Sequence, residues 1–143
     1  MSKLEKAISI ALDAHKGKLD KAGMPYILHP LRVMFKMKKE NEMIAAVLHD
    51  VVEDSEITFE QLKNEGFSNE VIDAVKSLTR LPEETYEEFI ERACNNPVGL
   101  KIKKADIIDN MNMSRIKNIT DNDLKRLMRY HKAFWAINDK ESL

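Results

Sequence analysis

Leu48-His49-Asp50-Val51-Val52-Glu53-Asp54 is the stretch that organises the chain, and it follows the apolar run Met43-Ile44-Ala45-Ala46-Val47. If the stretch is helical, the 100° step per residue places His49, Glu53, Asp50 and Asp54 at about 0°, 40°, 100° and 140°. The aliphatic side chains then fill the opposite side. The pattern therefore predicts a helix with one side in the core and a polar side that can hold ligands.

The polar side of this helix has two interpretations. A His and an Asp, each followed four residues later by a carboxylate, offer a divalent metal an imidazole nitrogen and a carboxylate oxygen from one turn. An amphipathic helix with a solvated acidic face carries the same residues. The rest of the chain decides between them.

Length and composition exclude several classes of protein. A chain of 143 residues has the size of one ordinary domain, so we expect residues 1–143 to form a single domain. The chain has 23 Lys and Arg against 24 Asp and Glu, and no block of like charge, which argues against a nucleic-acid or membrane partner. Neither a signal peptide nor an apolar run of about 20 residues is visible. Cys94 is the single cysteine, which favours a cytoplasmic protein and leaves any metal to His and carboxylates.

The composition predicts an all-α fold, a compact multi-helix domain. Gly, Pro and aromatic residues are few, and no stretch alternates with period two. We expect a first helix capped by Ser2 and ending near residue 15, then a structured loop over 17–30, with His29 just before a helix that begins at Pro30. Caps at Thr58, Ser68, Thr85 and Thr120 predict later helices, as does Pro97, whose helix should run to about Met113. The last helix should end near Asn138, with the final five residues frayed.

Outside the organising stretch, the candidates for chemistry are two positions on one helix and the histidines. Asp106 and Asn110 are four residues apart and flanked by apolar residues, so both can point inward, where a charged Asp needs a cation or a metal. A pair of surface residues is the alternative. We interpret His131 as a surface residue and His15 as a residue of a helix C-terminus, where an imidazolium favours the helix dipole.

Four ordered motifs resemble HD-superfamily metal-dependent phosphohydrolases. They are Ala14-His15-Lys16-Gly17, Gly23-Met24-Pro25-Tyr26-Ile27-Leu28-His29-Pro30, the organising stretch, and Lys104-Ala105-Asp106-Ile107-Ile108-Asp109-Asn110. More narrowly, they are similar to the hydrolase domain of the synthetase/hydrolases of ppGpp, the alarmone of the stringent response, and to stand-alone small alarmone hydrolases. The similarity spans roughly residues 4 to 135.

The resemblance implies an all-helical domain that holds one Mn²⁺ through His29, His49, Asp50 and Asp106. Glu53 and Asp54 match the catalytic acidic pair of the family, which activates water for attack on the phosphorus of the 3′-pyrophosphate. A site of two imidazoles and two carboxylates also suits Fe²⁺ or Zn²⁺. The bound ion lowers the pKa of water, and a carboxylate accepts the proton.

The resemblance also implies a nucleotide substrate. Asn110 and Lys21 match positions that contact it. Asp20 is a departure, because alarmone hydrolases commonly have Arg there and an acidic residue repels phosphates unless Lys18 or Lys21 compensates. We expect no synthetase or regulatory domain, and hence no synthesis of the alarmone.

The sequence leaves four hypotheses. The first is a ppGpp 3′-pyrophosphohydrolase that uses a metal-activated water. The second is a nucleotide-binding or sensing module that keeps the metal site without turnover, and Asp20 favours it. The third is a phosphatase for another nucleotide. The fourth, a helical bundle without a site, requires four matching motifs to coincide by accident.

Overall fold

The computed structural model describes residues 1–142, and the predicted all-α class is confirmed. Within these residues, the extended structure is an isolated bridge between Leu19 and Pro25. The helices are α1 (Lys3–His15), α2 (Leu28–Phe35), α3 (Glu40–Leu48), α4 (Val51–Asp54), α5 (Phe59–Asn64), α6 (Asn69–Ser77), α7 (Tyr86–Cys94), α8 (Pro97–Asn110), the 3₁₀-helix η1 (Met113–Arg115) and α9 (Asp121–Glu141). None of the helices in residues 1–142 is both long enough and apolar enough to cross a membrane.

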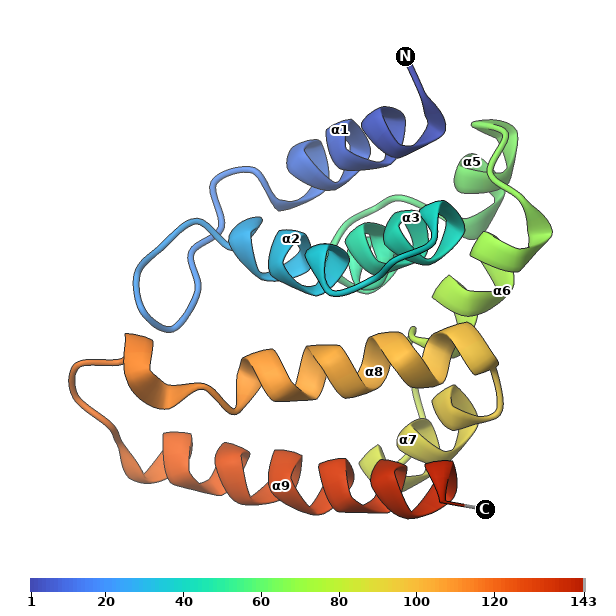
Figure 1. The fold of residues 1–143 in the computed structure, drawn as a ribbon. Coiled ribbons are helices and arrows are strands. Elements are labelled where there is room, and N and C mark those ends of the chain that lie inside the picture. The colour runs from blue at the N-terminus through green and yellow to red at the C-terminus, as the bar shows by residue number, and fades with distance from the viewer. Residues whose placement is uncertain (143) are drawn as a thin grey trace.

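Helix α3 forms the centre of the larger core, and α8 joins it to the C-terminal helices. Helix α3 packs against α1, α2, α6 and α8, and its residues 44–48 are almost completely buried. Helix α8 lies between α2 and α3 on one side and α9 on the other (Figure 1). A smaller apolar cluster, with Ile107 and Ile137 at its centre, fills the space between α8 and α9. Polar residues on the side of α8 that faces α2 and α3 can therefore contact residues of those two helices.

The predicted caps are confirmed. The side chains of Ser2, Thr58, Thr85 and Thr120 each accept a hydrogen bond from the backbone three residues later, and the residue there returns one to the cap. At α6, the Ser68 side chain accepts a hydrogen bond from the Val71 amide, without the reciprocal bond of a capping box. These signals are local, so the sequence is sufficient to locate the starts of the helices that carry such a cap.

The prediction of one helix through residues 48–54 is wrong, because the chain breaks at His49 and Asp50. Helix α3 ends at Leu48 and α4 begins at Val51. The His49 ring donates from Nδ1 to the carbonyl of Ala46, 2.7 Å away, and this carbonyl is the one that the Asp50 amide would use in a continuing helix. Asp50 leaves the helical region, with φ −118° and ψ 11°. The two residues therefore project from a turn rather than from a helix face.

Other boundaries differ slightly from the predictions. His29 lies inside α2, not before it, and Pro30 is in the first turn of that helix. Helix α8 ends at Asn110, short of Met113, while α9 continues past Asn138 to Glu141, so most of the segment predicted to fray is helical. Residue 143 of that segment is outside the described residues. The predicted loop over 17–30 is compact, and Gly23 adopts a positive φ of 82° in its tight turn.

Candidate metal centre

A buried group of three side chains lies where α2, the α3–α4 turn and α8 meet. Helix α2 contributes His29, the turn contributes His49, and α8 contributes Asp106; each is at most 5% exposed. One potential ligand atom from each side chain lies within 4.8 Å of the other two. The fold thus assembles a possible metal site from residues up to 77 positions apart (106 − 29).

The two imidazoles are oriented in the same way. His29 Nε2 is 2.9 Å and His49 Nε2 3.6 Å from the same oxygen, Asp106 Oδ1. The opposite ring nitrogens are engaged, because His29 Nδ1 lies 2.7 Å from Asp109 Oδ2 and His49 Nδ1 lies 2.7 Å from the Ala46 carbonyl. Metal-ligating histidines characteristically hold their second nitrogen in this manner. Two imidazole nitrogens and a carboxylate oxygen that face one point fit a divalent transition metal.

Asp106 is held on both of its oxygens. Oδ1 accepts from Asn110 Nδ2 at 3.1 Å, and Oδ2 accepts from Lys103 Nζ at 3.0 Å. Burial alone would raise the pKa of Asp106, but Lys103, His29 and His49 hold it well below its usual range. Lys103 is itself 8% exposed, and its ammonium lies 4.5 Å from the centre of the Phe89 ring. Asp106 is therefore an ionised carboxylate with one oxygen directed at the histidines.

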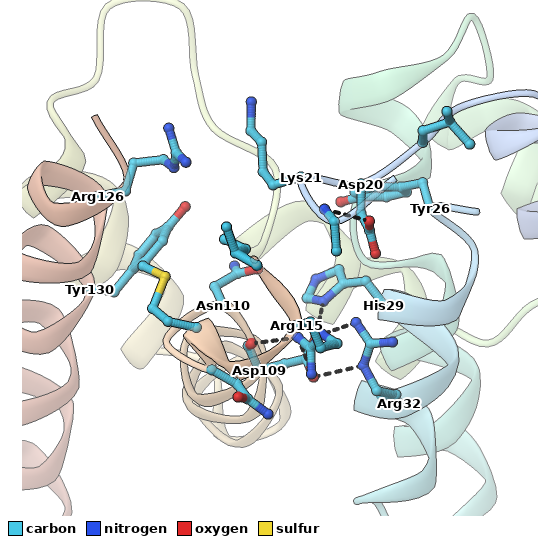
Figure 2. A pocket seen from close by; sticks show the side chains of 15 residues that line it. Asp20, Lys21, Tyr26, His29, Arg32, Asp109, Asn110, Arg115, Arg126 and Tyr130 are labelled. Carbon is cyan, nitrogen blue, oxygen red and sulfur yellow. Dashed lines mark hydrogen bonds and ion pairs between the residues drawn. The ribbon is translucent and has the colours of Figure 1, made fainter. Parts of the chain in front are cut away.

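Asp109 supports His29 from behind. Its carboxylate accepts two hydrogen bonds from Arg32, from Nε at 2.8 Å and from Nη2 at 3.0 Å, in addition to the one from His29 (Figure 2). Burial alone would lower the pKa of His29, but Asp106 and Asp109 raise it to about 9. Without a metal, the His29 ring is thus protonated at neutral pH and must release a proton before Nε2 can bind an ion.

Asp50 lies beside the three-residue group but points partly away from it. Its Oδ2 is 3.7 Å from His49 Nε2, while Oδ1 is 3.1 Å from His15 Nε2 and Oδ2 accepts from the Tyr26 hydroxyl. His15, Asp50 and Asp54 form a second group of potential ligands within 4.8 Å of one another. The four residues predicted as ligands are therefore neighbours, with three directed at one point and Asp50 held by His15 and Tyr26.

The predicted acidic pair lies on α4, next to Asp50, and both side chains reach solvent. Partial burial and the neighbouring Asp54 raise the pKa of Glu53, and partial burial and Asp50 raise that of Asp54. Lys18 donates to the backbone carbonyl of Asp54, which brings one cation to this acidic edge. A carboxylate with a raised pKa beside a metal site is suited to accepting a proton.

A cavity of about 420 Å³ opens next to His29. Lys21 and Asn110, predicted to contact substrate, both lie in its wall, together with Tyr26, Arg126 and Tyr130 (Figure 2). This volume falls in the range of cavities that take small-molecule ligands. The cavity and the three-residue group share His29, so a bound molecule can reach both.

Asp20 also lines this cavity, but one of its carboxylate oxygens is hydrogen-bonded within its own loop. Oδ1 accepts hydrogen bonds from the amides of Ala22 and Met24, both at 2.9 Å. The side chain thus closes the turn that contains Gly23 and fixes the wall of the cavity. Asp20 therefore has a structural role in this loop.

Sequence reasoning missed several residues of the centre. His15 does end α1, as predicted, but it is 2% exposed and contacts Asp50 instead of solvent. Lys103 lies three residues before Asp106 and Asp109 three residues after it. Residues at this spacing share a helix face, so the sequence could have indicated that both lie near Asp106. Arg32 had no local signal, because its partner Asp109 is 77 positions away. His131 is exposed, as predicted.

Comparison with known proteins agrees with this geometry. Residues 7–121 match the model of a family described as HD domain. The chain is 31% identical over 120 residues to a guanosine-3′,5′-bis(diphosphate) 3′-pyrophosphohydrolase of Aquifex aeolicus, covering 76% of this chain and 17% of that protein. It is 41% identical over 85 residues to the protein of the same name from Haemophilus influenzae, covering 55% of this chain and 13% of that protein. The chain thus spans less than a fifth of the length of these relatives.

A solved structure has the same fold. It is described as a metazoan ortholog of SpoT that hydrolyses ppGpp, and it superposes with a TM-score of 0.79 at 24% sequence identity, covering 96% of this chain and 85% of that one. The family match spans most of the chain and includes His29, His49, Asp50 and Asp106. On this match and the fold, the chain belongs to the HD-domain family.

Proposed function

We propose that this chain is a metal-dependent phosphohydrolase that releases pyrophosphate from the 3′ position of ppGpp. The observation that carries the proposal is the buried group of His29, His49 and Asp106, directed at one point and adjacent to a cavity of about 420 Å³. The similarity to two proteins named as ppGpp 3′-pyrophosphohydrolases supports the choice of substrate.

His29, His49 and Asp106 are the proposed ligands, with Asp50 as the fourth. Mn²⁺ is the proposed ion, since the mixture of imidazole and carboxylate suits it, although the same donors accept Fe²⁺ or Zn²⁺. Such an ion, when bound, lowers the pKa of a water molecule and neutralises phosphate charge. Asp109 and the Ala46 carbonyl keep the two rings in the binding orientation. The Asp50 carboxylate is held beside them by His15 and Tyr26 and would turn toward the ion to complete the set.

Glu53 and Asp54 are the proposed catalytic residues. Both have a raised pKa and both reach solvent beside Asp50, so either carboxylate can accept the proton of the attacking water. Because two acidic groups repel a polyphosphate, a cation is needed nearby, and Lys18 lies at the Asp54 backbone. We assign the proton to Glu53 and the orientation of water to Asp54.

The cavity is the proposed site of the nucleoside. Lys21 and Asn110 contribute an ammonium and an amide to its wall, and Tyr26 and Tyr130 contribute aromatic surface. Asn110 also donates to Asp106, so one side chain connects the nucleoside cavity to the proposed ligands. An aromatic wall with a few polar groups is suited to holding a nucleobase and a ribose.

Asp20 favours a second candidate, a phosphohydrolase for a different nucleotide. Its carboxylate lies in the cavity wall and reduces the positive charge available to a substrate with many phosphates. The reaction and the proposed ligands are the same in both cases.

Ion-exchange analysis of the products tests the proposal. The purified protein is incubated with Mn²⁺ and ppGpp, in parallel with mononucleotides and phosphorylated dinucleotide cofactors. We expect GDP and pyrophosphate from ppGpp, at a rate that an excess of chelator abolishes. Cleavage of another nucleotide alone would select the second candidate. No cleavage of any compound by a metal-loaded protein would contradict both and favour a sensing module.

A further inference from the structure

A second cavity of about 420 Å³ lies on the opposite face of α8 from the candidate metal centre. It is lined by the segment that connects α2 to α3, by Glu42 of α3, by one side of α8 and by Glu141 at the C-terminal end of α9. Ile108 and Asp106 are two residues apart on α8, about 200° around the helix axis. We refer to this cavity as the basic groove.

The floor of the basic groove is apolar. Met37, Leu100, Ala105 and Ile108 line it, and Ile108 remains 39% exposed. At 100° per residue, Leu100, Ala105 and Ile108 lie within an arc of about 140° on the side of α8 that faces the groove. Met37 packs against the larger core and Leu100 against the smaller one, so the groove follows the junction of the two apolar clusters. Its floor is therefore supported by the core on both sides.

The rim of the basic groove is positive. Two lysines of the rim are paired, Lys101 with Glu42 at 2.9 Å and Lys104 with Glu141 at 2.7 Å. The other three, Lys36, Lys38 and Lys39, form no ion pair within residues 1–142. They are exposed and fall within four consecutive positions at one end of the groove. The whole chain has a net charge of −1, so this end is a local concentration of positive charge.

We propose that the basic groove binds an acidic amphipathic helix of a partner protein. A helix that lays aliphatic side chains on the floor would bury Ile108 and Met37, and acidic residues beside that stripe would meet Lys36, Lys38 and Lys39. A recessed floor favours such a segment over an anionic bilayer, because a flat lipid surface does not fill a concave apolar groove. The occupant and the nucleotide bind at the same time, because the residues that line the two cavities differ.

Fluorescence anisotropy with synthetic peptides tests the proposal. The probe is a labelled peptide of about 15 residues, long enough to form a helix, with leucines on one face and glutamates on both sides of that face. One control peptide has lysine in place of glutamate, and a second has the same composition with the leucines distributed around the helix. We expect saturable binding of the probe with Kd below about 100 μM, weakened by salt, and none of either control.

The matched variants are K38E/K39E in the rim and K63E/K125E elsewhere on the surface. All four lysines are exposed, and the two double variants change the net charge equally. An acidic residue at position 39 also suits the N-terminus of α3. We expect K38E/K39E to weaken binding of the probe at least about tenfold, and K63E/K125E to leave it unchanged.

Three results would overturn the proposal. One is no saturable binding of the probe by the wild-type protein at concentrations up to about 1 mM. Another is equal affinity of the two double variants. The last is adsorption to phosphatidylserine vesicles that K38E/K39E abolishes, together with no peptide binding, which would assign the groove to a bilayer. Saturation of the protein with a nucleotide should not displace the peptide.

Discussion

Replacement of Asp109 by Asn separates the role of this residue from that of the proposed ligands, because Asp109 does not face the point at which the ligands converge. Its carboxylate accepts from His29 Nδ1 at 2.7 Å and twice from Arg32, at 2.8 and 3.0 Å. The amide of Asn has one acceptor oxygen, and its NH₂ group must face a donor, either His29 or Arg32. Asp109→Asn therefore keeps the size of the side chain and breaks its hydrogen bonding.

The expected magnitude follows from the two groups that lose their partner. Loss of the group that orients a metal-ligating histidine lowers metal affinity about 10- to 100-fold, or about 1.4–2.7 kcal/mol. Leaving a buried donor unpaired lowers the free energy of unfolding by about 1–3 kcal/mol. His29 is 5% exposed, so water does not replace its lost acceptor, whereas the Arg32 side chain is 32% exposed and regains part of its hydrogen bonding from solvent.

The assay is a competition titration of Mn²⁺ between the protein and a chromophoric chelator, with urea unfolding measured on the same samples. Asp139→Asn is the control, since it removes one carboxylate charge from an exposed position on α9. We expect metal affinity to fall in Asp109→Asn and to remain unchanged in Asp139→Asn. Equal affinity of the Asp109 variant and the wild type, or an equal loss in the control, would refute the reasoning.

Three further predictions concern other parts of the molecule. Glu53→Gln should retain metal, measured by the same titration, and lose about 10²- to 10⁴-fold in kcat because no carboxylate accepts the proton; unchanged turnover would remove Glu53 from the mechanism. Lys103→Met should lower the free energy of unfolding in urea by about 3–5 kcal/mol by leaving Asp106 charged and buried, whereas Lys38→Met should cost below about 0.5 kcal/mol; similar costs would contradict the ion pair. The hydrogen bonds that Arg92 donates to Glu84, at 2.6 and 2.9 Å, lower the pKa of Glu84 from 4.5 to about 2. Their contribution to the free energy of unfolding is therefore complete above about pH 4.5 and is lost as the pH falls through about 2. Glu84→Gln should therefore lower stability by about 1 kcal/mol at pH 7 and not at pH 2, and an equal loss at both pH values would be inconsistent with this pair.

The starts of the capped helices were predictable because a capping box is a contact between residues three apart, as at Ser2 and Thr85. The break after Leu48 was not, because it depends on the His49 ring and its contact with the Ala46 carbonyl, which no periodicity encodes. The arrangement around Asp50 was also beyond the sequence. His15 and Tyr26 reach it from 35 and 24 positions away, and only the packing of α1 and the 17–27 loop against the α3–α4 turn brings them there.

Asp106 and Asn110 represent the opposite case. Their spacing of four placed them on one face of a helix, and the structure has them in contact at 3.1 Å. Asp109 shares much of that face, but its partners Arg32 and His29 come from α2, so its importance follows from the packing of α2 on α8. Spacing along one helix was thus enough to pair residues of that helix. Partners on different helices were accessible only where the family resemblance supplied them, as for His29, His49 and Asp106.

The location of Mn²⁺ by anomalous diffraction from crystals of the metal-loaded protein tests the central claim most directly. The account predicts one strong peak at coordination distance from His29 Nε2, His49 Nε2 and an oxygen of Asp106, with Asp50 turned toward it. A peak among His15, Asp50 and Asp54 instead, or no ordered metal in protein that still cleaves ppGpp, would contradict it.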